Sequence, residues 1–252
     1  MSQLEKAQQL KTLHVKDNPL VLYNIWDAGS AKTIAKAGAA AVATGSWSVA
    51  GAQGYADGEA IPLDFLLTIV ERIAQSVDLP LSVDFEGGYA VDPASIQKNV
   101  ARLIAAGAVG LNFEDQIVGG SGLHTLEVQV ERIKAVRRAA DEAGVPLFIN
   151  ARTDLFLKER DSSVHATLIQ EALARQSEYA TAGADCFFIP GLTDKKLITE
   201  VCEQSTLPVN AMLLGDLKSV QDVSPLGVSR VSFGPGPYGI AAKDLAKRFA
   251  AI

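Results

Sequence analysis

Residues 105–115 read AAGAVGLNFED, and this stretch contains one complete transition from a helix to a buried strand. Gly107, which suits a left-handed helix cap, is followed by an apolar run that ends in polar residues. Similar Ala-Gly-Ala or Ala-Gly-Val strings surround Gly38, Gly144 and Gly183, each before another apolar run. The recurrence predicts a chain in which helices alternate with buried strands.

Eight apolar runs and the amphipathic segments between them cover nearly the whole chain. We expect strands at Pro19–Trp26, Ala40–Gly45, Leu79–Phe85, Val109–Asp115, Pro146–Thr153, Asp185–Gly191, Pro208–Leu213 and Val228–Gly234. We expect helices at Ala28–Ala37, Leu63–Val77, Pro93–Ala106, Thr125–Ala143, Ser162–Ala182, Asp194–Gln204, Ser219–Ser224 and Ile240–Ile252. Repeated strand–helix units with buried parallel strands predict an α/β fold, a parallel (β/α)8 TIM barrel that forms a single domain over residues 1–252.

The other α/β architecture to weigh is a doubly wound open sheet. Such a sheet would need a Gly-x-Gly-x-x-Gly turn after its first strand, and residues 27–30 read DAGS instead. No shift in composition marks a domain boundary. The barrel is therefore the favoured architecture.

Composition limits the classes of partner. The chain has 252 residues, of which 48% are hydrophobic, and a formal net charge of −6, which disfavours a general nucleic-acid binder. No apolar stretch approaches the roughly 20 residues of a membrane span, and Met1–Lys16 is polar. Cys186 and Cys202 fall in predicted core elements and are expected to be reduced packing residues. We expect a soluble, cytoplasmic protein without nucleic-acid or membrane partners.

Polar side chains share a face at the ends of three consecutive predicted strands. The in-phase pairs are Asp84 with Glu86, Asn112 with Glu114, and Asn150 with Arg152. Carboxylates crowded at one end of a barrel repel, and a hard divalent cation such as Mg²⁺ relieves that repulsion. The planar guanidinium of Arg152 suits a substrate carboxylate, although it would also fit a purely structural ion-pair network.

A turn and a long glycine-rich loop follow the second predicted strand. Backbone N–H groups around Gly45, Ser46 and Trp47 are candidates for binding an anion or a developing oxyanion, and an ordinary turn before a helix is the alternative. The loop over residues 49–59 lies on the face where barrel enzymes carry their chemistry.

Together these residues resemble the phosphoenolpyruvate mutase/isocitrate lyase superfamily over nearly the whole chain. The strand-three signature corresponds to residues 84–90 (DFEGGYA), and the strand-four Glu-Asp to residues 114–115. The strand-five Ala-Arg-Thr corresponds to residues 151–153, and the substrate-binding turn to residues 45–47. The loop aspartate of the superfamily corresponds to Asp57.

The resemblance implies an enzyme that uses Mg²⁺, with Mn²⁺ as the alternative, and acts on 2-oxo acids or their adducts through a pyruvate-like enolate. It assigns the metal to Asp84, Glu86 and Glu114, directly or through water. It also implies a homo-oligomer, a dimer or tetramer, often with the last helix exchanged between subunits.

The resemblance assigns the substrate to the other matching residues. Arg152 would bind the substrate carboxylate, and the amides of Ser46 and Trp47, next to Gly45, would stabilise the enolate oxygen. Asp57 and Arg152 are the expected catalytic residues of this set. Asn210, near the end of the seventh strand, is a candidate for the far end of the substrate or a polar layer of the barrel.

The sequence departs from the superfamily pattern in two places. Glu86 replaces the second aspartate of strand three, and residues 117–125 (IVGGSGLHT) lack the cysteine of the lyases as well as the Lys and Asn of the phosphonate enzymes. A cysteine-dependent isocitrate or methylisocitrate lyase is therefore not expected. His124 is a candidate proton donor in that loop, with Tyr89 as the alternative.

Three functions remain open from the sequence. The leading one is a Mg²⁺-dependent carbon–carbon lyase that cleaves or decarboxylates a small 2-oxo or 2-hydroxy carboxylic acid, expected as a di-acid. The second is phosphonopyruvate hydrolase or phosphoenolpyruvate mutase-like chemistry. The third is a barrel that binds a 2-oxo acid without catalysis.

Overall fold

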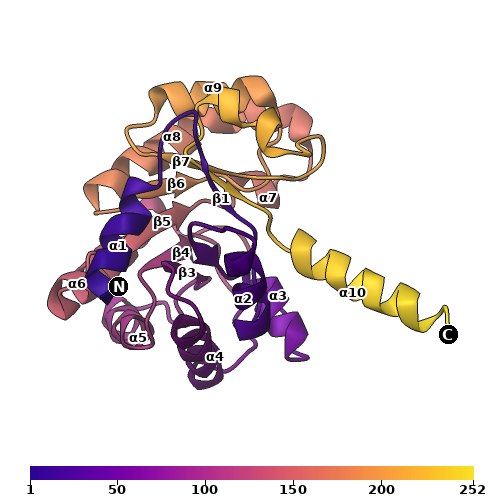
Figure 1. Cartoon of the computed structure of the whole chain (residues 1–252). Helices are drawn as coiled ribbons and strands as arrows, with labels where there is room; N and C mark the ends of the chain where they lie inside the picture. The colour runs from indigo at the N-terminus through magenta and orange to yellow at the C-terminus, as the bar shows by residue number, and fades with distance from the viewer.

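A computed structural model describes all residues, 1–252, and contains an eight-stranded parallel barrel (Figure 1). Its strands are β1 (Leu20–Leu22), β2 (Val42–Ala43), β3 (Leu81–Asp84), β4 (Gly110–Glu114), β5 (Phe148–Arg152), β6 (Cys186–Phe188), β7 (Val209–Met212) and β8 (Arg230–Ser232). Hydrogen bonds connect them in the order β1-β8-β7-β6-β5-β4-β3-β2. The predicted (β/α)8 TIM barrel is confirmed.

The seam between β1 and β2 closes the barrel with few hydrogen bonds. Ile25 and Thr44 form an isolated parallel bridge just beyond the two strands. The Ile25 N–H donates to the Ala43 carbonyl at 2.8 Å, and the Gly45 N–H donates to the Ile25 carbonyl at 3.3 Å. These two backbone bonds, together with the Asn24 side-chain amide that donates to the Thr44 carbonyl at 2.8 Å, complete the ring.

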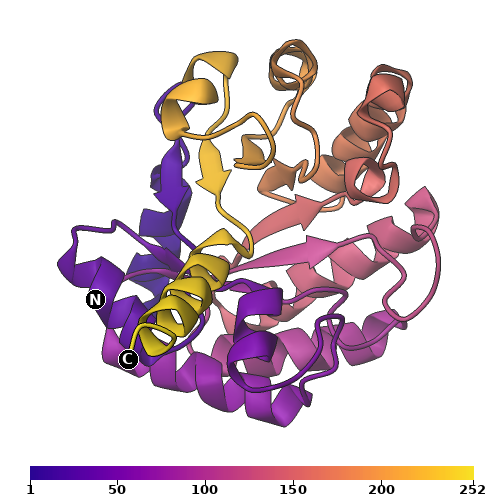
Figure 2. The same cartoon turned by 90° about the vertical axis from the view of Figure 1, so that its right-hand side faces the viewer.

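Helices surround the barrel (Figures 1 and 2). They are α1 (Gln3–Thr12), α2 (Ala28–Lys36), α3 (Ser46–Ala52), α4 (Leu63–Ser76), α5 (Pro93–Ala105), α6 (Leu126–Ala143), α7 (Leu155–Lys158), α8 (His165–Thr181), α9 (Lys195–Gln204) and α10 (Gly236–Phe249). None of these helices is both long and apolar enough to cross a membrane. One buried hydrophobic cluster runs from α1 to β8, so the barrel and its helices share a single core.

Local sequence explains where the helices begin and end. Asp92 caps α5 by accepting from the Ser95 N–H at 2.9 Å, and Thr125 caps α6 through the Val128 N–H. Gly107, after α5, has φ +103°, and a Cβ added there would lie 2.7 Å from the Cβ of Ala74. A glycine is therefore required by both conformation and close helix packing at this helix-to-strand transition.

The structure differs from the sequence prediction in several elements. The predicted helix over 219–224 is instead two 3-10 turns, Val220–Asp222 and Ser224–Leu226. Helices α1, α3 and α7 were not predicted, because each is short or buries few apolar residues. Several strands are shorter than their apolar runs. Both cysteines are free and buried, as expected.

The last helix, α10, points away from the barrel (Figure 1). Its base is anchored by Tyr238, whose ring packs edge-on against Trp26 and Trp47 at centroid distances of 5.2 and 5.7 Å. Beyond that base, Leu245 and Phe249 are 71% and 77% exposed. The helix therefore leaves its apolar side chains in solvent.

Candidate active site

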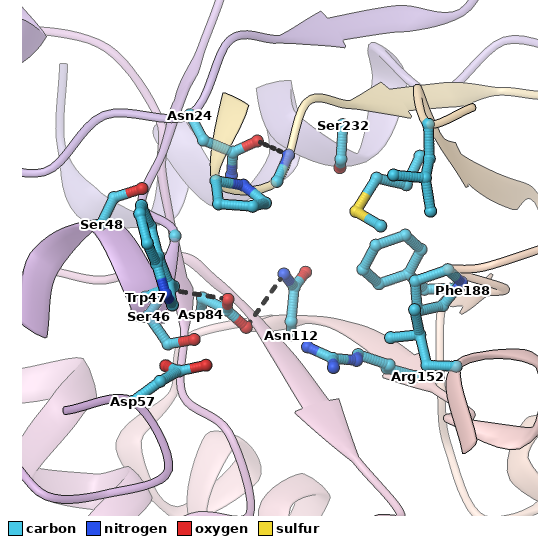
Figure 3. A pocket seen from close by; sticks show the side chains of 17 residues that line it. Asn24, Ser46, Trp47, Ser48, Asp57, Asp84, Asn112, Arg152, Phe188 and Ser232 are labelled. Carbon is cyan, nitrogen blue, oxygen red and sulfur yellow. Dashed lines mark hydrogen bonds between the residues drawn. The ribbon is translucent and has the colours of Figure 1, made fainter. Parts of the chain in front are cut away.

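A cavity of about 310 Å³ lies at the carboxyl ends of the strands (Figure 3), a volume typical of small-molecule sites. Residues in or just after all eight strands line it. They are Asn24, Gly45, Ser46, Trp47, Ser48, Asp57, Asp84, Asn112, Arg152, Leu157, Phe188, Pro190, Met212, Leu214, Ser232, Gly234 and Pro235. The cavity brings together Gly45, Ser46, Trp47, Asp57, Asp84 and Arg152 of the predicted site.

Asp84, the last residue of β3, lies at the centre of the hydrogen-bond network in this cavity. One carboxylate oxygen accepts from the Ser46 N–H at 3.0 Å, at the start of α3, and the other accepts from the Asn112 side chain at 3.3 Å. The Asp84 backbone N–H donates to the Thr44 hydroxyl at 2.9 Å. The Ser46 amide, which the superfamily resemblance assigns to the enolate oxygen, is thus bonded to Asp84 in this structure.

Asp57 reaches the same cavity from the long loop after α3. Its carboxyl faces the Ser46 side chain, close to Asp84 (Figure 3). Partial burial, followed by the negative charge of Asp84, raises the pKa of Asp57. A carboxyl group with a raised pKa at the edge of a cavity is suited to proton transfer.

Glu86 does not line this cavity but lies in a strained turn directly after β3. Glu86 and Tyr89 have φ angles of +50° and +58°, which non-glycine residues rarely adopt outside functional sites. The Glu86 side chain is buried and accepts from the Glu59 N–H at 2.9 Å. Burial, followed by the like charges of Asp57, Asp84 and Glu114, raises the pKa of Glu86 to about 9.

Arg152 is held between two buried carboxylates at the end of β5. Its Nη1 lies 2.9 Å from Glu114 Oε2, and its Nε and Nη2 donate to the two oxygens of Asp154 at 2.6 and 3.0 Å. Burial raises the pKa of Glu114, and the ion pair with Arg152 opposes that rise. A guanidinium has five N–H groups, so two remain for a ligand.

The residues proposed to hold a metal fit Mg²⁺ by donor type. The negative charge of Asp84 contributes to the raised pKa values of Asp57, Glu86 and Glu114, and a hard cation with oxygen ligands would relieve this repulsion. No group of three or more His, Cys, Asp or Glu side chains is arranged to enclose an ion directly. Mg²⁺ commonly keeps several waters beside one or two carboxylates, so an open arrangement suits it.

His124 and Tyr89, the candidate proton donors, line a second cavity of about 160 Å³ and not the main one. Burial lowers the pKa of His124. The Tyr89 hydroxyl is buried without a hydrogen-bond partner, and Arg132 and Glu59 line the same space. Both candidates are therefore separated from Asp84 and Arg152 in this structure.

Asn210 lies in a polar layer inside the barrel. It exchanges hydrogen bonds of 3.1 and 3.2 Å with the Ser232 hydroxyl, and Ser232 in turn lines the main cavity. Asn210 therefore does not line the cavity itself but contacts Ser232, which does.

Two buried polar residues near the cavity were missed by the sequence reasoning. The side-chain oxygen of Asn24 accepts from the N–H groups of Phe233 and Gly234, which directly follow β8. Arg230, fully buried on β8, donates to the Asn112 side-chain oxygen at 3.0 Å. A single polar residue inside an apolar run was the only signal of each.

The fold and this site define the class: a (β/α)8-barrel protein with an acidic pocket and one buried arginine at the carboxyl ends of its strands. The chain belongs to the phosphoenolpyruvate phosphomutase family, whose model matches residues 10–252. Members of this superfamily are enzymes, many of them carbon–carbon lyases.

Three relatives illustrate the range of the superfamily. The chain is 29% identical over 217 residues to 2-methylisocitrate lyase of Salmonella typhimurium, covering 84% of this chain and 71% of the relative. A crystal structure of a candidate phosphonomutase from Burkholderia cenocepacia is 42% identical, with a TM-score of 0.96 over 99% of both chains. A phosphonopyruvate hydrolase solved with oxalate and Mg²⁺ shares the fold at 21% identity, with a TM-score of 0.86 over 98% of this chain and 86% of that one.

Proposed function

We propose that this protein is a Mg²⁺-dependent carbon–carbon lyase that cleaves or decarboxylates a small 2-oxo or 2-hydroxy carboxylic acid through an enolate. The observation that carries the proposal is the placement of Asp84 and Arg152 in one cavity, with Asp57 beside them. Metal-holding carboxylates and a carboxylate-binding guanidinium in one pocket match the two ends of a 2-oxo acid.

Arg152 would bind and orient the substrate. One N–H group remains on Nη1 and one on Nη2 for a carboxylate, while Glu114 and Asp154 fix the guanidinium. A substrate carboxylate held there places its 2-oxygen toward Asp84. Orientation of this kind lowers the activation barrier because the substrate has already lost its translational and rotational entropy on binding.

Asp84 would hold the metal, with Glu86 and Glu114 acting directly or through water. When bound, Mg²⁺ supplies positive charge that polarises the 2-oxygen of the substrate. The backbone amide of Trp47, with that of Ser46 once it is released from Asp84, would donate to the same oxygen. Asp57 would accept or return the proton at the reacting carbon.

His124 is the second candidate for the proton transfer. Because it lines the neighbouring cavity, it would act only after the loop over 117–125 moves. A His124→Asn variant that retains full activity would remove it from the mechanism. Asp57→Asn should lower kcat by about 100-fold or more, the usual contribution of a general acid or base.

The first experiment is turnover and ligand binding in the presence of Mg²⁺. Purified protein is incubated with a panel of 2-oxo and 2-hydroxy acids, and released pyruvate is measured with a coupled dehydrogenase. Oxalate, an enolate analogue, should raise the melting temperature with Mg²⁺ and not without it. Asp84→Ala should abolish both effects, whereas Asp141→Ala, an exposed acid at the far end of α6, should not. Failure of both readouts in the unaltered protein refutes the proposal.

Phosphonate chemistry is the second candidate function, because the candidate phosphonomutase is 42% identical to this chain. Phosphorus NMR of phosphonopyruvate incubated with the protein and Mg²⁺ tests it directly. Loss of the phosphonate signal would favour a hydrolase or mutase. Oxalate binding without turnover of any substrate would favour the third possibility, a barrel that only binds 2-oxo acids.

We also propose that the protein is a homo-oligomer assembled through α10. The exposed apolar side chains of this helix, including Leu245 and Phe249, are typical of a surface that binds another protein. Val21 and Tyr23, on the outer side of the barrel, are 41% and 40% exposed and could receive this helix from a second copy of the chain. Light scattering should give a dimer or tetramer. Replacing Leu245 and Phe249 together by lysine should yield a folded monomer; a monomer before substitution would contradict the proposal.

A further inference from the structure

The main cavity has a polar side and an apolar side. Strands β2 and β3 bring Ser46 and Asp84 to one side, whereas Phe188 lies across the cavity from Asp57 and Trp47 (Figure 3). The Arg152 guanidinium borders the apolar side, 6.0 Å from the centroid of the Phe188 ring. The ends of β6 and β7 and helix α7 together form what we call the apolar wall: Leu157, Phe188, Pro190, Met212 and Leu214. The two sides would contact different parts of a bound substrate.

Arg152 is the only basic residue that lines this cavity. Its guanidinium already pairs with Glu114 and Asp154, and its free N–H groups are sufficient for one carboxylate. Lys158 follows Leu157 of the apolar wall in sequence, but its ammonium donates to the Gln116 side chain outside the cavity. Beyond Arg152, which borders Phe188 and is taken up by the first carboxylate, a second carboxylate on the substrate would meet no cation on the apolar wall.

This placement of charges determines whether a charged or an apolar substituent binds better against the apolar wall. A carboxylate moved from water to an apolar surface loses hydration that nothing there replaces. An alkyl group in the same position gains about fourfold in affinity for each methylene that it buries. The apolar wall thus selects against a charged substituent and for a hydrocarbon one.

We propose that the substrate is a 2-oxo or 2-hydroxy acid with a single carboxylate, whose far substituent is uncharged and apolar and lies against the apolar wall. This inference rests on the proposed function, since it assumes that Arg152 and Asp84 bind the carboxylate and the 2-oxygen. It restricts that function to carbon–carbon cleavage, because decarboxylation through an enolate would need a second carboxylate on the substrate. It departs from the di-acid expected from the sequence. Phe188, Met212 and Leu214 are then the specificity-determining residues.

The test compares two ligands of the same size and shape. Malate and 2-hydroxy-4-methylpentanoate have the same number of non-hydrogen atoms and differ only in a carboxylate against an isopropyl group. Titration calorimetry with Mg²⁺ should give about tenfold or greater preference for 2-hydroxy-4-methylpentanoate. Oxalate, which has no far substituent, is titrated in parallel as a measure of the shared part of the site.

A charge placed on the apolar wall should reverse the preference. Leu214 is 45% exposed, so Leu214→Lys should fold, and it should tighten malate binding by about tenfold while weakening 2-hydroxy-4-methylpentanoate. Leu4→Lys makes the same change on α1. Leu4 is 46% exposed, and α1 lies at the opposite end of the barrel, where Gln3 donates to the Ala108 carbonyl before β4. That variant should leave both affinities unchanged.

The outcomes separate the two proposals. If oxalate does not bind with Mg²⁺, the proposed function fails. If oxalate binds but malate binds as tightly as 2-hydroxy-4-methylpentanoate, or more tightly, the substrate class is wrong and the proposed function stands. A Leu214→Lys variant with the unaltered protein's preference would show that the apolar wall does not contact the far substituent, and would also overturn the inference.

Discussion

Arg152→Lys separates the charge of this residue from the shape of its guanidinium. Both side chains are cationic, but a lysine ammonium has one nitrogen, whereas Arg152 uses three nitrogens to reach Glu114 and Asp154. The variant keeps a buried positive charge between two buried acids. It should therefore fold, and any loss of oxalate affinity should report on the hydrogen-bonding geometry of the side chain.

The size of the loss follows from the hydrogen bonds. An ammonium that contacts both Glu114 and Asp154 uses at least two of its three N–H groups, which leaves one or none for a ligand, where Arg152 leaves two. Losing one hydrogen bond to a charged group costs about 1.5–3 kcal/mol. Oxalate should then bind about 10- to 150-fold more weakly.

Calorimetry of oxalate binding with Mg²⁺ measures this loss, and urea unfolding measures stability. Arg137→Lys is the matched control. Arg137, on α6, also pairs with a carboxylate, at 2.6 Å from Asp185, and donates to the Gly183 carbonyl. Both partners directly precede β6, at the other end of the barrel. It should lose stability to a similar degree and bind oxalate normally.

One result would refute this reasoning. If Arg152→Lys is destabilised like Arg137→Lys but binds oxalate as tightly as the unaltered protein, Arg152 serves only as the structural partner of Glu114 and Asp154. The carboxylate-binding role would then have to be assigned elsewhere.

Three further predictions concern the metal, packing and pH. Removing divalent ions with EDTA should abolish stabilisation by oxalate, and adding Mg²⁺ or Mn²⁺ should restore it; stabilisation that survives EDTA would argue against a metal. Gly107→Ala should cost about 1–3 kcal/mol more stability than Gly38→Ala in urea unfolding, since both have left-handed backbones but only Gly107 faces a neighbour, Ala74. Burial lowers the pKa of His14 to about 3. Below about pH 6.5 the unfolded state therefore binds a proton at this histidine that the folded state does not, so the free energy of unfolding decreases as the pH decreases. His14→Phe, which can keep the stacking on Phe148, should lose about 1 kcal/mol less between pH 6.5 and 5.5; equal losses would contradict this assignment.

The barrel was predictable from sequence because its strands are buried on both sides and therefore read as short apolar runs. Glycines such as Gly107 marked where each helix ends before the next strand. Strand length was less predictable: β2 is only two residues long, since the chain after it turns at once into α3. Apolar character reports burial, and burial continues past the last ladder hydrogen bond.

The meeting of Asp84 and Arg152 was also predictable, because parallel strands end at one edge and the period of two fixes which residues share a face. The partners of each were not. Asp154 turns back onto Arg152 through the first turn of α7, and the α3 N-terminus bonds Asp84 through Ser46. Such contacts depend on loop geometry, which periodicity does not encode.

The direction of α10 was not predictable either. Its helical pattern is clear over the predicted range of 240–252, but no periodicity shows whether a terminal helix folds back or extends. The ring of Tyr238 between Trp26 and Trp47 fixes only the base of the helix. Contacts distant in sequence decide the rest.

The closure between β1 and β2, which has only two backbone hydrogen bonds, has a kinetic consequence. Where longer ladders join the other strands, this seam depends on the N–H groups of Ile25 and Gly45, so it should be the first part of the ring to open transiently. Gly45 directly precedes the Ser46 amide that binds Asp84, and Asn24 lies beside Ile25. Amide hydrogen exchange at Ile25 and Gly45 should thus be faster than at the ladder amides of β4. A ligand seated on Asp84 should slow this exchange, making the seam a natural reporter of occupancy.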